Sequence, residues 1–96
     1  MDKTNFYLNL GKNIKKAREE KGYSLDEFSK ASGLDLNKST LSAIENGKQQ
    51  ISVYQLYLIT EALDLDISEL LKSLVAINGD KENLLNKNDI HKLENL

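Results

Sequence analysis

Apolar positions recur three and four residues apart along most of the chain, up to about residue 78. No segment alternates apolar and polar β-forming residues between hairpin turns, so the pattern predicts an all-α fold of five helices with essentially no sheet. The first helix would be capped by Thr4 or Asn5 and end at Gly22. Its inward positions would be Leu8, Ile14 and Ala17.

Residues 24–47 predict two short helices joined by a glycine-centred turn. Ser24 and Glu27, three residues apart, form the capping-box pattern of a helix start, and Gly33 ends that helix. Asn37 can cap the second helix. This is the layout that lets one helix enter a DNA major groove.

The second helix of this pair has one apolar face and one small polar face. Leu41 and Ile44 are three apart and can face the core together. The opposite face then carries Lys38, Ser39, Ser42, Ala43 and Asn46. Small residues fit closely against base edges, and lysine and hydroxyl groups can hydrogen-bond to bases or phosphates.

Two further helices are expected to close the core, one starting at Ser52 and one capped by Asp66. After residue 78 the sequence becomes polar and rich in asparagine. We therefore expect a domain over residues 1–78 and a tail over residues 79–96 that is either mobile or a short helix needing a partner.

Three segments occur in a characteristic order: LGKNIKKAREEKGYSLDEFSKASG, STLSAIENGK and LYLITEALDLDISELL. Together they resemble the lambda-repressor-like, or XRE-type, helix-turn-helix DNA-binding family over about residues 8–72. The resemblance implies five short helices around one core and a dimer that binds a pseudo-palindromic operator. The implied role is transcriptional regulation, most often repression.

When the functional positions of the family are carried over to this chain, they imply roles for individual residues. Base contacts would come from Lys38, Ser39 and Ala43, with Ser42 as a further candidate. Phosphates would be held by Ser24, Leu25, Thr40, Asn46, Gly47 and Lys48. Arg18 and Glu45 match a pair that joins the first helix to the recognition helix in the family; the alternative is two solvated surface charges.

The chain departs from the family pattern at three places. Leu25 stands where many members carry a phosphate-binding glutamine, and Asp35-Leu36 makes the turn about two residues longer than the common spacing. The segment Lys48-Gln49-Gln50-Ile51 is less basic than usual and lacks a proline. These departures predict modest phosphate affinity.

Charge also argues against strong binding to any DNA, because 13 Lys and Arg face 15 Asp and Glu, a net charge of −2. A dimer would double the contacts.

Tyr54 and Leu58, four apart, predict an apolar stripe that serves as a dimer or partner interface; core packing is the alternative. Apolar tail residues could cover such a stripe: Leu84, Leu85, Ile90 and Leu93.

Catalysis has little support, since the chain has one histidine, His91, no cysteine and no glycine-rich phosphate loop. We expect no enzyme activity, no cofactor and no metal.

Without a leader or a long apolar run, a cytoplasmic protein with no membrane contact is expected. The expected partners are double-stranded DNA and a second copy, with a regulatory protein as a further candidate.

The main hypothesis is thus a dimeric, sequence-specific repressor that reads an inverted repeat through the helix starting at Asn37. The competing hypothesis is an antitoxin-like or accessory protein-interaction module that uses Tyr54, Leu58 and the tail. Salt dependence separates the two, because phosphate binding weakens steeply with salt and an apolar contact does not.

Overall fold

The computed structural model describes residues 2–33 and 35–77, and this part of the chain contains five α-helices and no strand. The helices are α1 (Lys3–Glu20), α2 (Leu25–Ala31), α3 (Lys38–Glu45), α4 (Val53–Leu63) and α5 (Ile67–Ile77). The predicted five-helix, all-α fold is confirmed. The tail over residues 79–96, with His91 and the four apolar residues proposed as a cover, lies outside the described residues.

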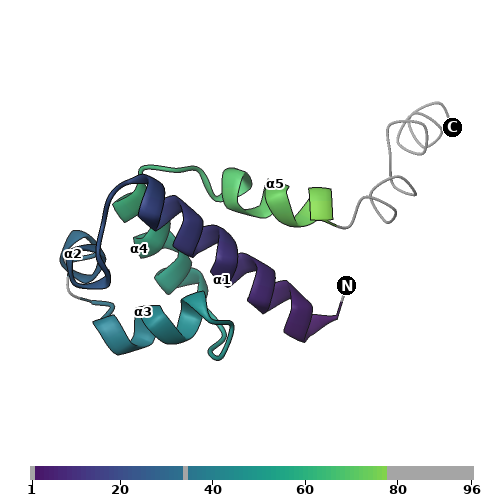
Figure 1. The fold of residues 1–96 in the computed structure, drawn as a ribbon, viewed down its shortest axis with the longest axis horizontal. Helices are drawn as coiled ribbons and strands as arrows, with labels where there is room; N and C mark the ends of the chain where they lie inside the picture. Colours follow the sequence, from purple (N-terminus) through teal and green to yellow (C-terminus); the bar gives the residue numbers. More distant parts are fainter. Residues whose placement is uncertain (1, 34, 78–96) are drawn as a thin grey trace, which may run out of the picture.

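Helix α1 is the longest and runs through the middle of the domain, with α3 on one side and α5 on the other (Figure 1). Its cap is Asp2, whose carboxylate accepts the Asn5 backbone N–H at 2.8 Å. The predicted caps Thr4 and Asn5 are therefore wrong: both lie inside the helix, because an aspartate nearer the N-terminus already satisfies the first free amide.

The inward face of α1 is set by Leu10 and Ile14, which are 2% and 0% exposed. Leu8 was predicted to point inward, and this is wrong, since its side chain is 37% exposed. At 100° per residue, a position two before Leu10 lies on nearly the opposite side of the helix. Ala17 is half-buried and packs against the core, as expected from its spacing.

The core joins all five helices and the turn before α3. Its fully or nearly buried members are Leu10, Ile14, Phe28, Leu36, Leu41, Ile44, Ile59, Ala62, Leu63, Leu70 and Leu74. Ser52 and Gln55 form a capping box at the start of α4, and α5 packs back on α1, where the Asn13 amide donates to the Leu70 carbonyl at 3.1 Å. The long α1 thus holds α3 and α5 in place on opposite sides.

One residue other than glycine adopts a left-handed backbone within the described part of the chain. Asp64 ends α4 with φ 54°. Aspartate tolerates this conformation better than most residues, although glycine tolerates it best. No helix in this part of the chain combines the length and the apolar character needed to cross a bilayer.

Candidate nucleic-acid interface

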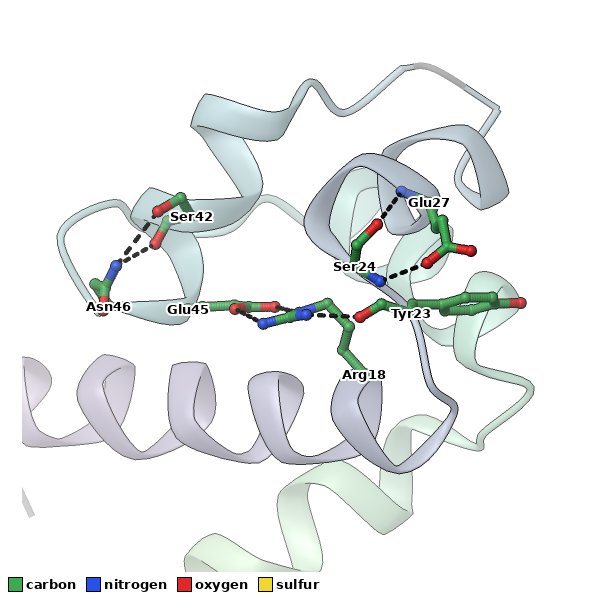
Figure 2. Close-up of polar contacts among 7 residues, drawn as sticks. All are labelled: Arg18, Tyr23, Ser24, Glu27, Ser42, Glu45 and Asn46. Atoms are coloured by element: carbon green, nitrogen blue, oxygen red, sulfur yellow. Dashed lines mark hydrogen bonds and ion pairs between the residues drawn. The ribbon is translucent and has the colours of Figure 1, made fainter.

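Local side-chain bonds define the starts of α2 and α3. The Ser24 hydroxyl accepts the Glu27 N–H at 3.1 Å, and the Ser24 N–H donates to Glu27 Oε1 at 2.9 Å (Figure 2). This second bond, from backbone to carboxylate, is the main cause that lowers the pKa of Glu27. At α3, Asn37 Oδ1 accepts the Thr40 N–H at 2.8 Å. Both predicted caps are therefore present.

The turn between α2 and α3 is anchored in the core although it is long. Leu36 is 1% exposed, and its carbonyl accepts the Ser29 hydroxyl at 2.6 Å. The Ser32 hydroxyl in turn donates to the Ser29 carbonyl at 2.7 Å. An apolar side chain and a buried hydrogen bond therefore hold the inner side of this segment against the core.

The far end of α3 is tied to α1 through a buried ion pair. Arg18 Nε donates to Glu45 Oε2 at 2.7 Å and Nη2 donates to Oε1 at 3.2 Å, while Nη1 donates to the Tyr23 carbonyl at 2.7 Å (Figure 2). Arg18 is 9% exposed and Glu45 is 5% exposed. A planar guanidinium that meets both carboxylate oxygens fixes orientation as well as distance.

Close backbone packing reinforces this tie. Gly11 of α1 lies against the last turn of α3, where an added Cβ would be 2.5 Å from the Glu45 carbonyl oxygen and 2.8 Å from its carbonyl carbon. A glycine is needed because any side chain would push the two helices apart. Sequence reasoning missed Gly11, since its environment depends on a residue 34 positions later in the chain.

With its inner side fixed in this way, α3 turns its small polar face outward. Lys38 and Ser39 are exposed, while Ser42 and Ala43 are half-buried. Together with Leu25, Asn46 and Lys48 they line one shallow, open concavity. Its lining combines ammonium groups, hydroxyls and small side chains, which is the chemistry that hydrogen-bonds to base edges and phosphates.

Comparison with known proteins identifies this arrangement. A helix-turn-helix family model matches residues 14–70, which is more than half of the chain. The chain belongs to the XRE-type helix-turn-helix family of DNA-binding transcriptional regulators. The resemblance drawn from the sequence is thereby confirmed.

Two similar proteins are named as regulators. The control protein C.MunI of a Mycoplasma species is 36% identical over 67 residues, a match that covers 70% of this chain and 89% of that protein. The clp gene regulator ClgR from Corynebacterium glutamicum has a crystal structure that aligns with a TM-score of 0.66 at 26% identity. That alignment covers 82% of this chain and 85% of the other.

Several backbone amides around the recognition helix already have acceptors within the protein. The amides of Asn46, Gly47 and Lys48 donate to the carbonyls of the preceding turn, at 3.0, 3.1 and 2.9 Å. The amides of Ser24 and Thr40 are used by the caps of α2 and α3. Phosphate contacts at Ser24, Thr40, Asn46 and Lys48 would therefore come from side chains, and Gly47 has no donor left for one.

Two residues at the end of the recognition helix are shaped by the fold itself. Gly47 has φ +71°, and an added Cβ would be 2.8 Å from Leu8, which lies over this turn instead of entering the core. The Asn46 side-chain amide donates to the Ser42 carbonyl at 2.9 Å and approaches the Ser42 hydroxyl at 3.4 Å (Figure 2). Asn46 thus links the helix end to a predicted base-reading position.

The apolar stripe predicted on α4 differs from the observed one. Tyr54 is 60% exposed, whereas Leu58 is half-buried and packs against the core, so the interface role of this pair stays a prediction. Leu58 is one residue before the fully buried Ile59, and the two therefore share the inner half of the helix. The exposed apolar residues beside Tyr54 are Val53, at 85%, and Tyr57, at 57%. We call Val53, Tyr54 and Tyr57 the α4 patch.

No group of histidine, aspartate and glutamate side chains that could hold a metal ion is present within residues 2–33 and 35–77.

Proposed function

We propose that this protein is a dimeric repressor that reads an inverted-repeat operator through α3. The observation that carries the proposal is the convergence of Lys38, Ser39, Ser42 and Ala43 with Leu25 and Lys48 around one open concavity. In this proposal the four residues of α3 contact base edges in the major groove. The names of the similar proteins, a control protein and a gene regulator, agree with a role in gene control.

Phosphates on either side of the groove are held in this proposal by a small set of donors. Lys48 supplies a charge at the end of α3, and the Leu25 N–H lies in the first turn of α2, where free amides attract anions. The Thr40 hydroxyl and the Asn46 side chain add neutral contacts. Ser24 and Gly47 shape this edge through the cap of α2 and the turn after α3.

Dimerisation compensates in this proposal for the low charge. A net charge of −2 gives the monomer no general attraction to phosphate. Two copies on a symmetric site double the base and phosphate contacts and make the second binding event intramolecular. We place the α4 patch at the contact between copies, because large exposed apolar side chains adjoin one another there. In this proposal the protein works in the cytoplasm.

Selection from a randomised DNA pool at moderate salt tests the proposal. The expected result is an enriched inverted repeat with half-sites about one helical turn apart. A folded protein that enriches no sequence would contradict operator reading. An enriched single half-site would contradict the dimer and retain DNA reading.

The α4 patch also favours a second candidate, an antitoxin-like or accessory protein-interaction module in which the patch binds another protein. Three large apolar side chains that are more than half exposed suit such a contact. The two candidates differ in their salt response. Phosphate-based binding should lose affinity steeply between 50 and 200 mM salt, on the order of 10³-fold for six contacts, whereas an apolar contact changes little.

A further inference from the structure

A hydrogen bond joins the outer face of α4 to the turn that precedes the recognition helix. The Tyr54 hydroxyl donates to Asp35 Oδ2 at 3.3 Å, although the two residues are 19 positions apart in the chain. Asp35 lies two residues before Asn37, the cap of α3. The negative charge of Asp35 is also the main cause that raises the pKa of Tyr54, which agrees with a phenol that keeps its proton beside a carboxylate.

A separate set of contacts holds the buried side of this turn. Leu36 enters the core, and its carbonyl accepts the Ser29 hydroxyl. Asp35 itself is exposed, and within the described residues its bond to Tyr54 restrains the outer side of the turn. A segment held on one side only can rotate about that anchor, and a second contact removes this freedom.

Rotation of the turn would displace the side chains at the start of α3 more than those at its end. Asn37 caps α3 through the Thr40 amide, and Lys38 and Ser39 are the first two residues of the helix. The opposite end of α3 is held separately by Arg18 and Glu45. A tilt at the N-terminal end would therefore move Lys38 and Ser39 while the ion pair stays in place.

We propose that Tyr54 is a positioning residue for DNA reading, whose hydrogen bond to Asp35 holds the first turn of α3 in the orientation that base contact requires. The proposal rests on the proposed function for its effect on DNA, and it assigns to Tyr54 a role separate from any contact between copies. The hydroxyl performs the positioning role, whereas the ring belongs to the α4 patch. Tyr54→Phe separates the two, because it removes the hydroxyl and keeps the ring.

Amide hydrogen exchange in the free protein tests the positioning contact without DNA. Tyr54→Phe should speed exchange of the Thr40 and Leu41 amides by about two- to tenfold, the range expected for one net hydrogen bond. The Tyr23 amide, which donates to the Arg18 carbonyl, should keep its rate. Tyr57→Phe is the matched control, since Tyr57 is similarly exposed on the same helix and its hydroxyl has no hydrogen bond within the described residues.

Binding to the duplex recovered from the random pool, beside an unrelated duplex of equal length, tests the consequence. Tyr54→Phe should lower affinity for the recovered duplex by about two- to tenfold and leave affinity for the unrelated duplex unchanged. Asp35→Ala should bind the recovered duplex about two- to tenfold more weakly than Asp35→Asn, which has the same net charge. Asp35→Asn keeps an acceptor oxygen and should retain most of the affinity. The double variant Tyr54→Phe with Asp35→Ala should bind no worse than either single variant, because both remove the same bond.

Each outcome is decisive. Unchanged exchange at Thr40 and Leu41 in Tyr54→Phe would overturn the proposal, whether or not the protein reads DNA. Faster exchange with unchanged discrimination between the two duplexes would also overturn it. Failure to recover any duplex would count against the proposed function, and the exchange rates would still decide whether Tyr54 holds the turn. A shift from dimer to monomer in Tyr54→Phe would assign the loss to assembly and overturn the positioning role.

Discussion

Gly11 of α1 and Glu45 of α3 meet through their backbones, so that a Cβ on Gly11 would lie 2.5 Å from the Glu45 carbonyl oxygen. This close approach predicts that Gly11→Ala lowers the free energy of unfolding instead of raising it. In an ordinary helix interior the change to alanine stabilises by roughly 0.5–1 kcal/mol. Here we expect a loss of about 1–3 kcal/mol in the free energy of unfolding, because the helices must separate. Urea unfolding followed by circular dichroism measures it, with Lys12→Ala as an exposed control on α1. A stabilised Gly11→Ala protein would contradict the packing.

The Arg18–Glu45 pair predicts that removing one of its charges costs more stability than removing both. Arg18→Ala leaves the Glu45 carboxylate buried without its partner and should cost about 3–5 kcal/mol. Arg18→Met combined with Glu45→Leu removes both charges and should recover most of that loss. Asp26→Ala, which breaks the exposed Lys30–Asp26 pair, should cost less than about 0.5 kcal/mol. Equal losses for Arg18→Ala and the double variant would show that packing, rather than charge, sets the cost.

The capping box of α2 makes stability depend on pH. The pKa of Glu27 lies below its ordinary value of 4.5, chiefly because the carboxylate accepts the Ser24 N–H. A lowered folded-state pKa means that the contribution is present above 4.5 and is lost as pH falls through the folded-state value. Glu27→Gln keeps a capping acceptor but does not titrate. The stability difference between the two proteins should be constant near neutral pH and shrink in acid; a constant difference throughout would exclude this role of Glu27.

Base reading by the recognition helix predicts localised effects on operator affinity. Lys38→Ala and Ser39→Ala should each weaken binding to the selected operator by about tenfold, since a base contact contributes roughly 1–3 kcal/mol. Helix content should not change, because both side chains are exposed. Fluorescence anisotropy measures the affinity, and Lys72→Ala on α5 controls for the loss of a positive charge. Equal losses for Lys38→Ala and Lys72→Ala would indicate a general charge effect.

The α4 patch predicts a change of oligomeric state. Val53→Glu with Tyr57→Glu places two charges on the patch and should give monomers, as measured by sedimentation equilibrium. Both side chains are more than half exposed, so the fold should persist. Glu61→Gln, an exposed change on the same helix, is the control. A double variant with unchanged mass would remove the patch from the contact between copies.

The helix starts of this fold could be predicted because the interactions are local. Ser24 with Glu27 and Asn37 with Thr40 are pairs three residues apart, so the sequence alone contains both partners. The polar face of α3 followed from helical spacing. In the same way, the family match rested on motifs that are continuous in the chain.

What the sequence did not reveal depends on residues that are distant in the chain. The need for glycine at position 11 arises from α3, and the bond between Tyr54 and Asp35 joins α4 to the turn before α3, 19 positions away. Leu8 was misplaced for a related reason, since spacing gives the apolar stripe but not which leucine at its edge meets the core. The phosphate contacts carried over from the family did not anticipate that several amides would already be used.

The recognition helix has only eight residues, fewer than an isolated helix needs to form in water. A fragment that contains α2 and α3 alone would therefore be mostly unstructured, and its side chains would have no common surface to present. The ability to read DNA then exists only in the folded fraction of the protein. While the folded fraction is close to one, a small loss of stability changes the concentration of active protein little. Once heat or a weakened Arg18–Glu45 pair brings the free energy of unfolding near zero, that concentration falls steeply. The melting temperature of the domain therefore sets the upper limit of the temperatures at which this protein can bind DNA.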